Sequence, residues 1–198
     1  WVEIVDRSVR RRGQRYFPLR DDSGLFVRKA DVTFSRARRK LPRPLKPGQK
    51  WIDAHIIPGT ITVYLGLQPV YATLFSPGKG GAAIPGYDPE VYAMTETGVF
   101  FLEWKEHVAT MTNEMGEPKI MWITDVPHIQ YLRAPLAMHV SFWHEDFSNK
   151  KSAECLNVSP RDGRWLFGFT EPQLPPDWSA IRPGGGNGKS TPIIVRAF

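Results

Sequence analysis

Cys155 is the only cysteine in this chain of 198 residues, and its surroundings suit a reactive thiol. It lies between Glu154 and a polar, turn-forming run in the stretch NKKSAECLNVSP (149–160), and two histidines, His139 and His144, precede it. A thiol with an ordinary pKa of about 8.5 needs a neighbouring base or cation to be mostly thiolate at neutral pH. A Cys–His nucleophile pair is therefore the best functional hypothesis. The alternative is structural, with Cys155 as a small buried hydrophobe.

The same residues also have the atom types of a metal site. His139, His144 and Cys155, with Glu145, could form a His₂Cys set, but their spacing matches no metal signature, and we expect no metal and no other cofactor. The run GGGNGKS (184–190) is similar to a phosphate-binding loop. Pro183 stands where its first glycine is required, and only eight residues follow the run. We interpret it as a flexible loop before a final strand, PIIVRAF (192–198).

The segments that must position these residues are mainly of strand type. Strands are predicted for ITVYLG (61–66), PVYATLF (69–75), GVFFLEW (98–104) and KIMWI (119–123), the first two joined by a tight turn that contains Gly66. Glycine and proline number 17 and 18, well above average use, which favours many turns and few long helices.

One helix is well signalled, directly after the cysteine. Ser159 is a good N-cap, Pro160 suits the first helical position, and the charge of Asp162 suits the first turn. An apolar stripe follows at Trp165, Leu166 and Phe169. Cys155 should therefore lie beside the N-terminal end of this helix, on a strand or turn that holds it firmly.

The N-terminal part of the chain differs in composition from the rest. YFPLRDDSGLFVRKADV (16–32) predicts a hairpin that turns at 22–24, and the proline-rich KLPRPLKPGQK (40–50) predicts an extended linker. We therefore divide the chain into a basic β-rich appendage with its linker, residues 1–45, and a larger domain, residues 46–198. The appendage could be the remnant of an SH3-like module. A lone hairpin is marginal in water, so it needs something to pack against.

The net charge of +6 is concentrated in this appendage, where residues 1–45 hold 13 Lys and Arg against 5 Asp and Glu. The basic runs 10–12 and 36–40 form either a solvated face or a contact for an anionic polymer, such as an envelope polyanion. We expect no nucleic-acid partner.

The remaining composition bounds the compartment only loosely. A single cysteine allows no internal disulfide, and no apolar run approaches the roughly 20 residues of a membrane span, so we expect a soluble chain. The chain begins at Trp1 rather than at a methionine, which suggests a processed or truncated form from which any export signal is already missing.

A longer stretch resembles a known family. HVSFWHEDFSNKKSAECLNVSPRDGRWLFGFTEPQLPPDW (139–178) is similar to the active-site segment of the L,D-transpeptidases, the YkuD-type catalytic domain. The signature of that family is a histidine followed, after a loop, by Ser-His-Gly-Cys, an apolar residue and Asn. Here His139 precedes Cys155 by 16 residues, and Ser152 and Asn157 match the signature. Upstream, residues 51–81 resemble the opening strands of the family and TETG (95–98) its Thr-Pro-x-Gly turn, so the resemblance covers about residues 50–198.

The resemblance implies a mainly β, β-sandwich-like catalytic domain with one or two short helices, a monomer in the periplasm or cell envelope. Its substrates would be peptidoglycan stem peptides. Cys155 would attack the bond between the L-centre of a diamino acid and the terminal D-alanine, with His139 as general base. The acyl group would then pass to an amine of a second stem or to water. The resemblance also assigns oxyanion or orienting roles to Glu154, Val140 and Ser152, and substrate contacts to Tyr131, Trp143, His144, Asn157 and Met111.

The chain departs from the signature close to the thiol. Ala153 and Glu154 replace His-Gly, and Val140 replaces the glycine that usually follows the first histidine. Two hypotheses follow: an active L,D-transpeptidase or L,D-carboxypeptidase, and a degenerate relative that binds peptidoglycan or a partner without turnover. If the enzyme hypothesis holds, His139 should reach the Cys155 sulfur, directly or after a small rearrangement. Glu154 should turn its carboxylate toward solvent or toward a cation such as Lys150 or Lys151.

Overall fold

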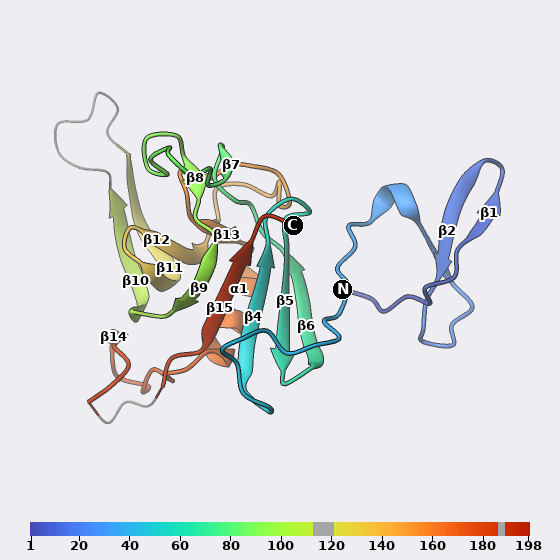
Figure 1. Cartoon of the computed structure of the whole chain (residues 1–198). Helices are drawn as coiled ribbons and strands as arrows, with labels where there is room; N and C mark the ends of the chain where they lie inside the picture. The colour runs from blue at the N-terminus through green and yellow to red at the C-terminus, as the bar shows by residue number, and fades with distance from the viewer. Residues whose placement is uncertain (113–120, 186–188) are drawn as a thin grey trace. The chain divides into compact units, whose positions relative to one another are not determined.

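The computed structural model describes residues 1–112, 121–185 and 189–198, and the chain divides into two compact units, Trp1–Arg36 and Ala37–Phe198. The first unit is an antiparallel three-stranded sheet in the order β1 (Val9–Arg11), β2 (Gln14–Pro18), β3 (Phe26–Arg28), followed by a 3-10 turn, η1 (Lys29–Asp31) (Figure 1). The predicted hairpin is confirmed as β2 and β3. Strand β1 was not predicted. No residue of this unit is fully buried.

The second unit contains two five-stranded sheets. One runs in the order β6 (Gln68–Leu74), β5 (Thr60–Leu65), β4 (Lys50–His55), β15 (Pro192–Arg196), β9 (Gly98–Phe101). The other runs in the order β13 (Leu156–Val158), β12 (Leu136–Val140), β11 (Trp122–Arg133), β10 (Trp104–Thr112), β14 (Ala180–Ile181). A short parallel pair, β7 (Gly81–Ala82) and β8 (Met94–Thr95), lies outside both sheets, and the described part of the unit has one α-helix, α1 (Pro160–Phe169). The expected mainly β, sandwich-like fold is confirmed.

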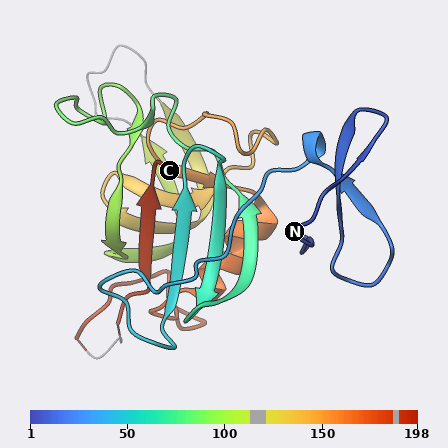
Figure 2. The same cartoon turned by 45° about the vertical axis from the view of Figure 1, so that its right-hand side comes forward.

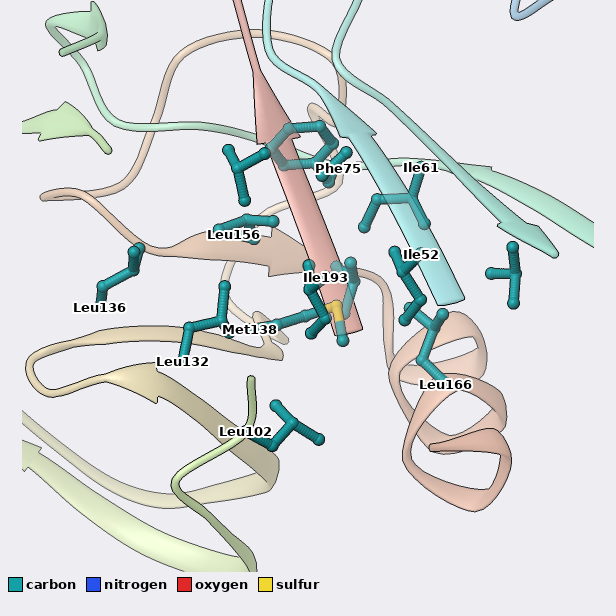
Figure 3. Packing of buried hydrophobic residues seen from close by; sticks show 14 of the residues in the cluster. Ile52, Ile61, Phe75, Leu102, Leu132, Leu136, Met138, Leu156, Leu166 and Ile193 are labelled. Carbon is teal, nitrogen blue, oxygen red and sulfur yellow. The ribbon is translucent and has the colours of Figure 1, made fainter. Parts of the chain in front are cut away.

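The main core joins the two sheets and the helix. Its fully buried members come from β4, β5 and β15, from β11, β12 and β13, and from α1, and include Ile52, Ile61, Ile193, Leu132, Met138, Leu156 and Leu166 (Figure 3). Side chains alternate between the two faces of a strand, so each sheet sends one set of apolar side chains into this core. Burying a side chain of this size stabilises the fold by roughly 1.5–3 kcal/mol.

The helix begins where the sequence predicts. The Ser159 hydroxyl accepts a hydrogen bond from the backbone N–H of Asp162 at 3.2 Å, and Pro160 is the first helical residue. The helix lies close to β12 because residue 163 is a glycine. A Cβ at Gly163 would come within 2.4 Å of a methyl group of Val140. The end of β12 and the start of α1 are therefore fixed against each other.

The proline-rich segment belongs to the second compact unit and covers the outer face of the sheet that contains β4 and β5 (Figure 2). Trp51 and Tyr64 stack with ring centroids 4.2 Å apart, and Leu41 and Leu45 pack against them. The Nε atom of Arg38 lies 2.8 Å from a carboxylate oxygen of Asp53, an ion pair that commits one charge of the basic run 36–40 to the fold.

The other strand predictions are met where they can be compared. Residues 61–66, 69–75, 98–104 and the C-terminal run correspond to β5, β6, β9 with the start of β10, and β15, and Gly66 has the positive φ of a tight turn. The predicted strand 119–123 begins outside the described residues and continues into β11, and part of the loop 184–190 also lies outside them. Among the described residues, no helix is long and apolar enough to cross a membrane.

Candidate active site

Strands β12 and β13 position the histidine and the cysteine. They pair in parallel, with His139 opposite Asn157. Because their neighbours Met138 and Leu156 point into the main core, His139 and Asn157 face the other side of the sheet. Cys155, one residue before β13, has the same parity as Asn157. His139 and Cys155 therefore face the same side, as diagonal neighbours on adjacent strands whose Cα atoms are roughly 8 Å apart in ideal sheet geometry.

The His139 imidazole is held in one tautomer. Its Nδ1 atom lies 2.9 Å from the backbone oxygen of Val140. A carbonyl oxygen can only accept a hydrogen bond, so Nδ1 carries the proton and Nε2 keeps its lone pair. Burial lowers the pKa of His139 to about 4. At neutral pH this residue is therefore an uncharged base with a free acceptor nitrogen.

The Cys155 side chain is half-buried and packs against Val126, Ile129 and Ala137. Its thiol donates a weak hydrogen bond to the backbone oxygen of Pro135, with the sulfur 3.6 Å away. Burial, with a smaller contribution from the charge of Glu154, raises the pKa of this thiol to about 12. Cys155 is thus a neutral thiol at neutral pH, and it needs a base to take its proton as it reacts.

No hydrogen bond joins His139 to Cys155 in the described part of the chain, because the thiol is turned toward Pro135. Proton transfer between the two side chains therefore needs the thiol to rotate about its Cα–Cβ bond. Catalytic hydrogen bonds are often long or misaligned before substrate binds, so the arrangement remains compatible with a base and nucleophile pair.

Two of the three residues expected to orient the site make backbone contacts there. Val140 supplies the carbonyl that orients His139, a role that does not depend on its side chain. Ser152 donates its hydroxyl proton to the backbone oxygen of Cys155 at 2.5 Å, which closes the turn before β13. Neither Val140 nor Glu154 is among the described residues with positive φ, so the loss of glycine at these positions strains neither backbone.

The expectation for the Glu154 side chain is wrong. The residue is only 5% exposed, and its buried Oε1 atom has no hydrogen-bond partner in the described ranges of the chain. Lys151 pairs with Asp146 at 2.9 Å, and the Lys150 amine lies over Gly81. Burial is the main reason that the pKa of Glu154 is raised to about 7.

The five residues assigned to substrate binding fall into two groups around the thiol and the imidazole. Met111 and Tyr131 pack in the same apolar cluster as Cys155. The other three gather beside His139. The Trp143 ring centroid is 5.9 Å from that of His139, and the Asn157 amide nitrogen is 3.5 Å from Nε2 of His144. The structure therefore brings all five to the neighbourhood of the candidate pair.

One contact near the thiol was not predicted. The buried Thr95 hydroxyl accepts a hydrogen bond from the backbone N–H of Gly78 and donates one to the backbone oxygen of Glu154, both at 2.7 Å. Gly78 also lies close to the segment that precedes Thr95, because a Cβ at Gly78 would be 2.2 Å from the carbonyl oxygen of Ala93. The TETG turn was the available signal, but only the fold shows that its first threonine fixes the residue before Cys155.

The metal alternative finds no support in the structure. Among the described residues, no group of three or more His, Cys, Asp or Glu side chains is arranged to hold a metal ion. His139, His144 and Cys155 are near one another, but they bond to Val140, Asn157 and Pro135 respectively.

Comparison with known proteins identifies the fold. No protein-family model and no curated protein matches the sequence. The structure is similar to the L,D-transpeptidase from Mycobacterium smegmatis, with a TM-score of 0.53 and 20% identity over 75% of this chain. It is also similar to the catalytic domain of the E. faecium L,D-transpeptidase, with a TM-score of 0.52 and 19% identity over 75% of this chain and 98% of that domain.

A third similar structure is L,D-transpeptidase 3 from Mycobacterium tuberculosis in complex with a faropenem-derived adduct, with a TM-score of 0.52 and 16% identity over 74% of this chain and 60% of that one. This chain spans 59% of the M. smegmatis structure. At these identities the similarity shows the fold: the chain has the fold of the L,D-transpeptidase catalytic domains, as the sequence resemblance implies.

Proposed function

We propose that this chain is a cysteine acyltransferase of the L,D-transpeptidase type that acts on stem tetrapeptides of peptidoglycan in the cell envelope. One observation carries the proposal. The only thiol of the chain, one residue before β13, and the neutral imidazole of His139 on β12 face the same side of one sheet. The fold shared with L,D-transpeptidases supports the choice of substrate class.

The chemistry follows from the protonation states of the pair. The Cys155 thiol, rotated away from Pro135, gives its proton to Nε2 of His139 as the sulfur attacks the carbonyl carbon that precedes the terminal D-alanine. The imidazolium then returns this proton to the leaving amine, and a thioester remains on Cys155. An amine of a second stem, or water, next attacks the thioester and loses a proton to His139, and the sulfur leaves and regains it. Cross-linking and trimming therefore share the first half-reaction.

A second candidate function has a specific observation in its favour. Glu154 places a carboxyl beside the thiol where the family signature has glycine, and its charge opposes thiolate formation. A chain that forms no acyl-enzyme but keeps the groups around Tyr131 and Trp143 would act as a peptidoglycan-binding protein without turnover.

The two functions are separated by incubation of the chain with a defined disaccharide tetrapeptide. We expect the intact mass of the chain to increase by that of the acyl group, and either free D-alanine with a tripeptide or a cross-linked dimer to appear. Cys155→Ala should form neither adduct nor product. His139→Gln, which replaces the imidazole with a neutral side chain that cannot act as a base, should slow acylation by about a hundredfold or more.

Binding of each variant to purified sacculi provides the control. The proposal is overturned if the folded wild-type chain forms no adduct and no product yet sediments with sacculi as strongly as Cys155→Ala does. That result would establish the binding function instead.

A further inference from the structure

Glu154 is a buried acid that the chemistry above does not use. It is 5% exposed and precedes Cys155 directly in the chain, and no described residue forms a hydrogen bond with its Oε1 atom. Buried polar groups are nearly always paired in native proteins, so an unpaired one next to a candidate nucleophile calls for a functional explanation. Its backbone is fixed by the Thr95 hydroxyl, so the side chain cannot leave this position through a simple loop movement.

The groups that face Glu154 are mostly acidic. Glu90, Glu96 and Asp88, from the segment between β7 and β9, all disfavour its carboxylate form, and Arg133 of β11 favours it. Arg133 is itself ion-paired with Glu96, so its charge is largely compensated. The local field therefore holds a proton on Glu154 over part of the neutral pH range.

We propose that Glu154 is an electrostatic gate on Cys155, whose protonated form leaves the thiol able to ionise and whose carboxylate form suppresses thiolate formation. The gate opens as the pH falls. Burial, with the acidic neighbours, raises the pKa of Glu154 to about 7, so the change falls in the neutral range. As regulation of acyl transfer by Cys155, this inference rests on the proposed function. It predicts that the reactivity of Cys155 stops rising with pH once Glu154 ionises.

The size of the effect follows from Coulomb's law. Two unit charges roughly 5 Å apart at an effective dielectric constant of about 20 change an ionisation equilibrium by about a hundredfold. At pH values below the pKa of a thiol with no titrating neighbour, the thiolate fraction increases tenfold for each unit by which the pH is raised. While Glu154 titrates, each pH unit removes the open form of the gate as fast as it adds thiolate. The reactivity of Cys155 should therefore stay nearly constant over about two pH units above pH 7.

The test uses the fact that Cys155 is the only cysteine. The full chain is treated with dipyridyl disulfide, a neutral aromatic disulfide, and the released thiopyridone is followed from about pH 5.5 to pH 10. We expect the wild-type rate to rise tenfold per unit to about pH 7, level off, and rise again above about pH 9. Glu154→Gln should rise without a level region, match wild type within about twofold at the lowest pH, and exceed it at least tenfold at pH 9.

A second variant keeps the inference testable if Glu154→Gln is poorly folded. Glu90→Gln removes one of the charges that raise the pKa of Glu154, so the level region of the rate profile should begin at lower pH. The region should keep its width of about two pH units, because the interaction between Glu154 and Cys155 is unchanged. A wild-type rate that rises tenfold per unit throughout overturns the gate, and so does a level region that persists in Glu154→Gln. The assay needs no stem peptide. A level region without acyl-enzyme formation would support the gate and overturn the proposed function. Acyl-enzyme formation without a level region would support the proposed function and overturn the gate.

Discussion

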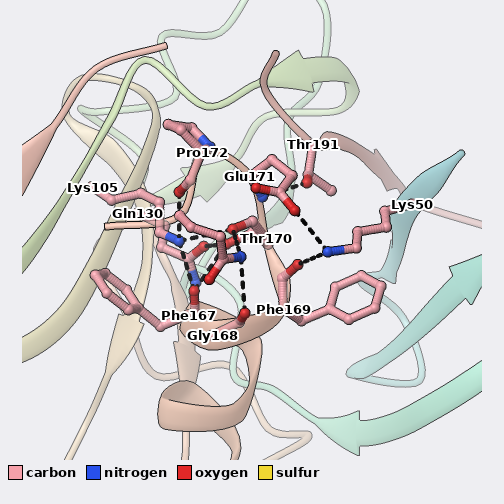
Figure 4. Close-up of polar contacts among 11 residues, drawn as sticks. Lys50, Lys105, Gln130, Phe167, Gly168, Phe169, Thr170, Glu171, Pro172 and Thr191 are labelled. Carbon is pink, nitrogen blue, oxygen red and sulfur yellow. Dashed lines mark hydrogen bonds and ion pairs between the residues drawn. The ribbon is translucent and has the colours of Figure 1, made fainter. Parts of the chain in front are cut away.

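Lys105 and Glu154 are both ionisable residues buried in the second unit, but they differ in how many hydrogen-bond partners surround the ionisable group. Lys105 has no exposed surface, and its ammonium donates to the backbone oxygens of Phe167, Thr170 and Pro172 at 2.6, 2.9 and 3.1 Å (Figure 4). All three of its protons are used. Glu154 is 5% exposed, and one of its carboxyl oxygens has no hydrogen-bond partner among the described residues.

The difference separates a structural role from a functional one. The last carbonyl groups of a helix have no partners within the helix, and Lys105 donates to one of them, Phe167, and to two carbonyl groups just beyond the end of α1, Thr170 and Pro172. A buried charge of this kind is compensated and holds the fold together. The Glu154 side chain caps no helix and pairs with no backbone group among the described residues. A carboxyl left unpaired in the interior destabilises the fold unless it stays protonated. It lies next to the only thiol, where a change of charge has a chemical consequence.

The largest expected effect is the loss of Lys105. Lys105→Met should lower the free energy of unfolding by about 3–5 kcal/mol in urea titrations, because the Pro172 carbonyl loses its donor and those of Phe167 and Thr170 keep only one donor each, from Thr170 and Gln173. Lys50→Met is the matched control. Lys50 reaches the same end of α1, bonding to Phe169 and Glu171, but its side chain is 37% exposed, so its loss should cost less than about 1 kcal/mol. Equal costs for the two lysines would contradict the structural role of Lys105.

Replacing Glu154 should have the opposite sign and depend on pH. The pKa of Glu154 is raised from 4.5 in the unfolded chain to about 7 in the fold, so the unfolded chain releases this proton first as the pH rises. The fold is thereby destabilised, by up to about 3 kcal/mol, between about pH 4.5 and pH 7. Glu154→Gln should match wild type near pH 4 and be more stable by up to about 3 kcal/mol at pH 8. A variant less stable than wild type at pH 8 would show that the carboxylate is compensated in the fold.

Restoring the family signature tests the same contrast through reactivity. The double change Ala153→His with Glu154→Gly removes the opposing charge and returns an imidazole beside the thiol, without requiring a new backbone conformation. Acylation by a β-lactam of the carbapenem class should accelerate by about tenfold at pH 8 and by up to about a hundredfold above pH 9, where the larger factor corresponds to roughly 2.7 kcal/mol. The single change Ala153→His serves as the control, and equal rates for single and double variants would remove Glu154 from the account.

The smallest expected effect lies at the other end of the helix. Ser159→Ala removes the side chain that caps α1 and should cost about 1 kcal/mol in unfolding experiments, much less than Lys105→Met. Because Ser159 contacts neither the thiol nor the imidazole, the pH dependence of Cys155 labelling should keep its shape. A changed shape would mean that the helix start, and not only Glu154, tunes the thiol.

The elements that the sequence predicts are those specified by neighbouring residues. The turn at Gly66 and the cap at Ser159 are local signals, and both are present in the structure. Strand β1 was missed because its VRR sequence has a single β-forming residue, and its pairing depends on β2. The pairing of Cys155 with His139 is implied by the family resemblance and stays a prediction.

The buried charges could not be predicted in this way. Lys105 lies in a strand where a lysine is ordinarily exposed, and its partners are carbonyl groups more than 60 residues later in the chain. Glu154 was expected to turn away from the thiol, toward solvent or toward Lys150 or Lys151. Its burial depends on the segment around Thr95, 59 residues earlier, which only the fold brings to it. Residue type predicts that a lysine or glutamate is exposed, whereas its burial depends on contacts with residues far away in the sequence.

The central claim is that Cys155 is an acylatable nucleophile served by His139, and intact-mass measurement with a carbapenem tests it most directly. At about pH 6, where Glu154 is protonated, the folded wild-type chain should gain the mass of one β-lactam. Cys155→Ala should gain none, and His139→Gln should react at least tenfold more slowly. A folded wild-type chain that stays unmodified at this pH, or a Cys155→Ala chain that is modified equally, would contradict the account.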